Sequence, residues 1–134
     1  MLPCAELFKN ELDSKNLHYG YQQIDDNAVN ISFPYGGKIV NCIFSGDAGE
    51  YLSLYLTYET VPEEKIADLI FLCNELNATY KWVTFFVDKS CNIVLHDDAI
   101  LSLESAVDEA FELLLHIISI GDKAKPVIMK TIYG

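Results

Sequence analysis

His96, Asp97 and Asp98 form the densest cluster of polar, titratable side chains in the sequence. A histidine beside two carboxylates offers the donor types that bind a divalent metal. Successive residues of a β-strand point to opposite faces, however, so His96 and Asp97 can converge only if the strand bends. Triplets of this kind more commonly end a strand and begin a loop. We therefore predict no metal site, and the sequence alone leaves open whether the three side chains meet.

A second acidic set, Glu104, Asp108 and Glu112, recurs at intervals of four residues. On a helix this spacing places all three carboxylates on one face. Such a row could chelate a cation or receive basic side chains, but a solvated helix face is the more common use. We therefore interpret the row as solvated surface.

The sequence contains no G-x-S-x-G, H-E-x-x-H, Walker or dinucleotide fingerprint. Ser14, Ser45 and Ser53 have no adjacent histidine and acid that would activate a nucleophile. The four cysteines are far apart and form no C-x-x-C or Cys/His pattern. We predict no catalytic residues, no cofactor and no enzymatic activity.

Acidic residues dominate the charge of the chain. Aspartate and glutamate number 20 against 9 lysines and arginines, which gives a net charge of −11. This balance argues against nucleic-acid binding through a general basic surface and against attraction to an anionic membrane. It attracts basic or amphipathic polypeptide segments, so we predict a protein or peptide partner. The alternative interpretation, that the charge only keeps the protein soluble, stays open.

The first residues lack the basic start and the apolar run of a signal peptide. The longest apolar run, at residues 113–118, is too short to span a bilayer and contains His116. We therefore expect a cytoplasmic protein without membrane association.

Residues 61–97 organise the chain, with an amphipathic helix that leads into a β-hairpin. Leu69, Cys73 and Leu76 belong to a stripe with the three-and-four spacing of one buried helix face. Residues 82–87 are apolar on both faces, which favours a central strand, and residues 93–95 return as its partner. Leu69 and Phe85 should be buried between helix and sheet. We interpret Trp82 as a core aromatic, and Asn77 as the residue where the helix ends.

The rest of the chain supplies one helix and several strands before this stretch and a long helix after it. A helix is predicted at 2–15, and strands are predicted at 19–24, 29–33, 39–44 and 51–58, where apolar and polar residues alternate. The fold class is α+β, with helices packed on an antiparallel sheet of three or four strands plus a hairpin. At 134 residues the chain forms one domain, 1–134.

The last helix, predicted at 103–120, has an apolar stripe wider than one face. Four residues widen it: Phe111, Leu113, Leu115 and Ile120. A helix that is apolar all round must be covered all round, either by another chain or by the segment after Gly121 folding back. Pro126 should kink or restart the helix, and the path after Gly121 stays open. We predict that the four residues form the interface of a homodimer, which usually buries about 800 Å² per chain.

Several segments resemble the YbjN-like family. They are 61–65 (VPEEK), 73–77 (CNELN) and 80–83 (YKWV), with 128–130 (IMK) and 133–134 (YG) at the end of the chain. The resemblance covers nearly the whole sequence and is strongest at 61–87. Members are often labelled bacterial sensory transduction regulators, and their fold is similar to that of type III secretion chaperones.

The resemblance supports the fold more than the function, and it implies no catalytic or ligand-binding residues. Our first hypothesis is a non-enzymatic regulatory or interaction module that binds a polypeptide in an apolar groove beside an acidic face. Two alternatives stay open: a secretion-type chaperone for one effector protein, and a small-molecule sensor with a pocket between the sheet and the helices.

Overall fold

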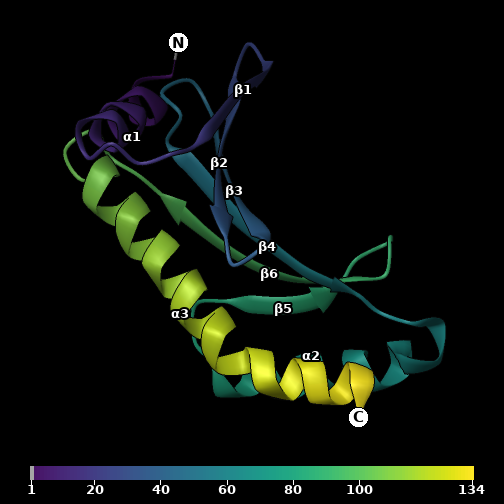
Figure 1. Ribbon diagram of the computed structural model, residues 1–134. Coiled ribbons are helices and arrows are strands. Elements are labelled where there is room, and N and C mark those ends of the chain that lie inside the picture. The colour runs from purple at the N-terminus through teal and green to yellow at the C-terminus, as the bar shows by residue number, and fades with distance from the viewer. Residues whose placement is uncertain (1) are drawn as a thin grey trace.

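Three α-helices cover one face of a six-stranded antiparallel sheet in the computed structural model, which describes residues 2–134 (Figure 1). The helices are α1 (Pro3–Ser14), α2 (Ile66–Thr79), which follows the short 3-10 helix η1 (Glu63–Lys65), and α3 (Ala106–Tyr133). The strands are β1 (Gly20–Asp25), β2 (Ala28–Tyr35), β3 (Lys38–Ser45), β4 (Tyr51–Thr60), β5 (Thr84–Val87) and β6 (Asn92–Ile100). Their order in the sheet is β1-β2-β3-β4-β6-β5. The predicted α+β class, the antiparallel sheet and the long C-terminal helix are confirmed. The likeness to type III secretion chaperones stays a prediction.

The register of the sheet decides which side chains face the helices. Ile31 lies opposite Cys42, Cys42 opposite Leu54, and Leu54 opposite Asp97. Directly opposite residues of antiparallel strands point to the same face, and the first three side chains of this row are buried. Asp97 therefore points toward the helices. His96, which lies opposite Tyr55, points to the other face, over which no described helix lies (Figure 1).

The contact between α2 and the sheet forms as the periodicity predicts. Leu69 and Phe85 are 0% and 1% exposed, so both are confirmed as core residues. The helix does not end at Asn77 but continues to Thr79. The Asn77 side chain instead accepts a hydrogen bond from Phe85 N–H at 2.6 Å and donates one to Phe85 C=O at 3.0 Å.

The prediction that β5 lies in the centre of the sheet is wrong, since β5 is an edge strand. Its apolar character has another explanation. The α2 helix packs against it, and the Asn77 amide occupies backbone groups of Phe85. An edge strand whose backbone groups are occupied in this way is protected from pairing with another chain.

The helix α3 is one element of 28 residues and does not end near Ile120 as predicted. It bends near its middle, where Gly121 rests on the sheet and Pro126 removes the hydrogen bond to the carbonyl of Asp122 (Figure 1). The helix continues because its second half has its own buried face, which includes Ala124, Ile128 and Ile132. This half packs along α2, so the segment after Gly121 does not fold back over the first half.

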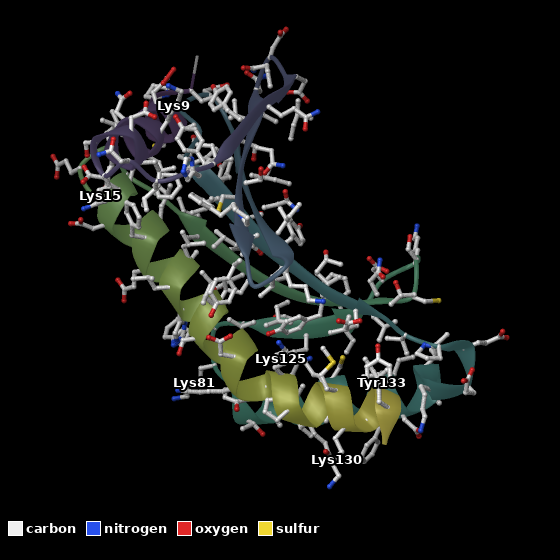
Figure 2. All side chains as sticks on the ribbon, in the orientation of Figure 1. Lys9, Lys15, Lys81, Lys125, Lys130 and Tyr133 are labelled. Carbon is white, nitrogen blue, oxygen red and sulfur yellow. The ribbon has the colours of Figure 1, made fainter. Side chains whose placement is uncertain are left out.

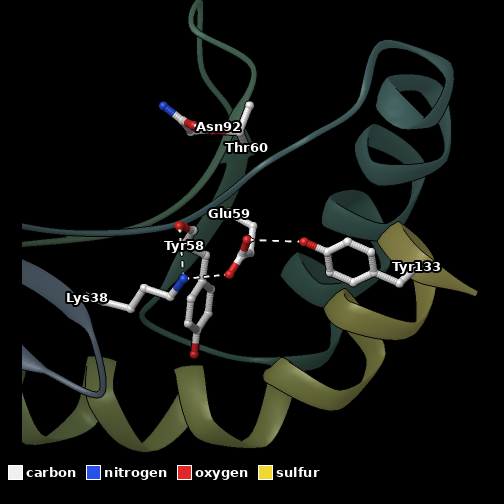
Figure 3. A network of polar contacts seen from close by, with 6 residues as sticks. All are labelled: Lys38, Tyr58, Glu59, Thr60, Asn92 and Tyr133. Atoms are coloured by element: carbon white, nitrogen blue, oxygen red, sulfur yellow. Dashed lines mark hydrogen bonds and ion pairs between the residues drawn. The ribbon is translucent and has the colours of Figure 1, made fainter.

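Polar contacts attach the end of α3 to the sheet. Lys38 Nζ lies 2.6 Å from Glu59 Oε1, and the Tyr133 hydroxyl donates a 3.4 Å hydrogen bond to Glu59 Oε2 (Figure 3). Nearer the bend, the Tyr35 hydroxyl donates to Asp122 Oδ2 at 2.5 Å. These contacts join β2, β3 and β4 to the second half of the helix.

Gly121→Val should lower the free energy of unfolding by about 1–3 kcal/mol, because the site has no room for a side chain. A Cβ at this position would lie 2.8 Å from the Tyr58 hydroxyl oxygen and 3.2 Å from a methyl carbon of Leu56. Urea unfolding measures the loss. Lys123→Val, at an exposed position of the same helix, controls for the helix propensity of valine. A Gly121→Val protein as stable as the parent would contradict the close packing.

Candidate functional site: a groove between β6 and α3

A groove of about 610 Å³ lies between the end of β6 and the first half of α3. Its volume is within the range typical of ligand sites. Its apolar wall consists of Trp82, Ala99, Leu113 and Leu115. Its polar residues are Asp97, Asp98, Glu109, Glu112, His116 and Ser119. The groove is therefore an apolar channel with a largely acidic border.

Trp82 stands at the rim of this groove, and its interpretation as a core aromatic is wrong. The side chain is 74% exposed, and the residue precedes β5 by two positions rather than forming part of it. Its φ angle is 77°, a left-handed conformation that is unusual for a bulky residue and costs about 1–3 kcal/mol. The fold thus holds a large aromatic in an unfavourable backbone conformation and presents it to solvent.

Asp97 is a buried acid in the wall of the groove, only 8% exposed. Its Oδ1 accepts a hydrogen bond from the Asp98 N–H at 2.9 Å, while its buried Oδ2 has no hydrogen-bond partner among residues 2–134. Burial raises the pKa of Asp97 above the ordinary 3.8, and the Asp98 N–H and the nearby His116 offset part of that rise. A buried carboxylate oxygen without a partner is costly, so this position is unfavourable for folding alone.

The sheet separates the cluster His96, Asp97 and Asp98. On the face away from the helices, His96 Nε2 lies 2.8 Å from Asp98 Oδ1, and the Ser53 hydroxyl donates to the same oxygen at 2.6 Å. The Tyr55 ring stacks on His96 with a centroid separation of 4.6 Å. Asp97 points to the other face. Among residues 2–134, no three His, Cys, Asp or Glu side chains are grouped so that they could hold a metal ion.

The acidic row of the last helix is also divided. Glu104 precedes α3, and both it and Asp108 are exposed outside the groove. Glu112 borders the groove together with Glu109. Part of the row is thus solvated surface, as predicted, and its last member belongs to the candidate site.

The four residues predicted as an interface have different environments. Phe111 is partly buried against Phe8, with ring centroids 5.0 Å apart, and Ile120 is only 5% exposed. Leu113 is half-buried and Leu115 is 64% exposed, and both line the groove. The apolar residues that widen the stripe therefore lie in three environments. Phe111 packs against α1, Ile120 is buried in the core, and Leu113 and Leu115 line the groove.

Two site residues, Trp82 and Asp97, were not predicted from the sequence. Ile93, Leu95 and Asp97 are spaced two residues apart, so a strand that continues past Leu95 places Asp97 on the same buried face as the other two. The strand was instead predicted to end at Leu95. Nothing in the pattern around Trp82 distinguishes it from the buried aromatics Phe85 and Phe44.

A family model named YbjN, described as a putative bacterial sensory transduction regulator, matches residues 10–119. The match extends from α1 into α3 and includes the residues that line the groove. No curated protein matches the sequence. Within residues 2–134, no helix has the length and apolar character needed to cross a membrane.

Asp97→Asn should be more stable than the parent at pH 7, because it removes a desolvated charge. Since the pKa of Asp97 is raised in the fold, the parent loses stability as pH rises from 3.8 through the folded pKa. The advantage of the variant should therefore be small near pH 4 and larger at pH 7. Urea unfolding at both pH values measures it. A variant that is less stable than the parent, by a margin that grows with pH, would show that the Asp97 carboxylate is well paired.

Proposed function

We propose a regulatory role for this chain, which belongs to the YbjN family, exerted by binding a polypeptide segment in the groove between β6 and α3. The family is described as a regulator of sensory transduction, which supports a non-enzymatic regulatory module. The groove supports the finer statement about a polypeptide partner.

The observation that carries the proposal is the exposed Trp82 at the rim of the groove. Its backbone conformation is unfavourable, and such conformations persist where the surrounding structure enforces them, commonly at functional sites. Leu115, 64% exposed, lines the same groove. Tryptophan is enriched among the residues that dominate binding energy at protein interfaces. Together they offer an aromatic and an aliphatic anchor for the apolar face of a partner.

The charge around the groove selects the kind of partner. The carboxylates of Glu109 and Glu112 border it, and none of the described residues that line it is a lysine. In Figure 2, Lys9 and Lys15 lie near α1 and Lys125 and Lys130 along the second half of α3, while Lys81, the chain neighbour of Trp82, lies near the bend of α3. A basic amphipathic segment would complement this surface, with its apolar side chains in the groove and its cations toward the acids.

A second copy of the chain fits the groove less well than a basic segment. A homodimer through this surface would bring Glu109 and Glu112 of both copies into one interface. Like charges that face each other at an interface disfavour association. We therefore prefer a basic polypeptide over the homodimer that the helix pattern predicts.

A random phage-displayed peptide library is first depleted of peptides that bind the Leu115→Glu variant and is then selected on the parent protein. The peptides that remain should bind the groove. Trp82 is the only tryptophan in the chain, so its fluorescence reports occupancy of the groove directly. Leu115→Glu should weaken the binding of the soluble peptides about 30-fold or more, the loss typical of an interface anchor. Leu103→Glu, which alters an exposed leucine outside the groove, is the matched control.

Failure to obtain peptides that distinguish the parent from Leu115→Glu would contradict the proposal. Sedimentation of the parent provides a second check. A stable dimer that Leu115→Glu dissociates and Leu103→Glu does not would assign the groove to a second copy of the chain.

A further inference from the structure

We propose that the groove recognises one lysine or arginine side chain of its partner, whose cationic group pairs with Asp97. This inference rests on the proposed function and names the residue of this chain that sets its specificity. Asp97 would be the specificity determinant inside the groove, whereas the acids at the border contribute general attraction.

The position of Asp97 in the sheet is the first argument. It ends a row in which the other members, Ile31, Cys42 and Leu54, are buried apolar or weakly polar residues. An aliphatic side chain would fill the place of Asp97 without the cost of desolvating a charge. The carboxylate therefore has no evident role in folding, which points to a role in binding.

The unpartnered oxygen is the second argument. Asp97 is more than nine-tenths buried and lines the groove, yet only Oδ1 accepts a hydrogen bond within the described structure. Buried polar atoms nearly always have partners, so an exception indicates a partner that arrives from outside. The χ2 torsion of aspartate has a broad minimum, and a small rotation about it would turn Oδ2 toward the groove.

Among the described residues that line the groove, none is a lysine or arginine that could complete the pair. His116 is the basic side chain that lines it, and no hydrogen bond joins His116 to Asp97 among the described residues. No grouping of His, Cys, Asp or Glu within residues 2–134 could bind a metal there. A charged donor from the partner would satisfy Oδ2 and form a charge-assisted hydrogen bond.

The walls of the groove fit the stem of a long basic side chain. Leu113 and Leu115 can cover the methylene groups of lysine or arginine while the charged end reaches Asp97. Trp82 adds an aromatic face that attracts a cation, most strongly a guanidinium group. An apolar path that leads to a buried acid is selective for a side chain that is apolar along its length and cationic at its end.

The test replaces each basic residue of a groove-selected peptide in turn, lysine by norleucine and arginine by citrulline. One replacement should weaken binding about 10- to 100-fold, the range for a hydrogen bond between charged groups. Asp97→Asn should weaken the unmodified peptide by a similar factor, and the two changes together should cost little more than either one. Asp108→Asn, which changes the net charge equally at an exposed position outside the groove, is the matched control.

Each outcome decides the inference. Peptides that bind through Leu115 but tolerate every replacement, and also tolerate Asp97→Asn, would overturn it and leave the proposed function intact. An equal loss in Asp108→Asn would show that only general attraction acts, and would also overturn it. A selection that yields no Leu115-dependent peptide would overturn both proposals. Thermal unfolding of Asp97→Asn, expected at or above the parent midpoint, excludes misfolding as the cause of a loss.

Discussion

The close contact of Gly121 with β4 and β6 fixes the geometry on which the other packing depends. Leu56, Tyr58 and Leu95 surround the place where a Cβ would lie, so at Gly121 the backbone of α3 lies directly against these side chains of the sheet. From this point the first half of α3 reaches α1, where Phe111 meets Phe8, and the second half lies along α2 (Figure 1). The groove lies along the first half, between α3 and the end of β6. The packing that holds the helix to the sheet therefore also positions the candidate site.

Two locally unfavourable features meet at this groove. Trp82 combines a positive φ with an exposed indole, and Asp97 combines burial with an oxygen that accepts no hydrogen bond from the described part of the chain. Proteins whose local preferences otherwise agree with the fold tend to break those preferences at functional sites. The proposed role of Asp97 predicts opposite effects of its replacement, a gain in stability and a loss of peptide binding.

Much of the fold could be predicted from the sequence, because periodicity records burial directly. The alternation in β2, β3 and β4 and the helical spacing in α2 each identified the buried face, including Leu69. The predictions failed where a distant contact overrides local preference. The sheet and α2 offset the cost of Gly121 and Pro126, so α3 continues past them. Asn77 binds Phe85 instead of ending its helix, and Trp82 is exposed by a backbone conformation that no local pattern encodes. Only Leu113 and Leu115 of the predicted interface reach the site, since the position of α1 over Phe111 cannot be read from the helix itself.

The most direct test of this account is to map a groove-selected peptide on the isotope-labelled protein by NMR. The account predicts the largest changes in backbone chemical shift at Trp82, at residues 97–99 of β6 and at residues 109–119 of α3, with small changes elsewhere. The opposite face of the sheet, around Tyr55, Phe86 and His96, offers an alternative surface of aromatic side chains. Changes centred on that face, with the amides of Trp82 and residues 109–119 unmoved by saturating peptide, would contradict the assignment of the groove as the functional site.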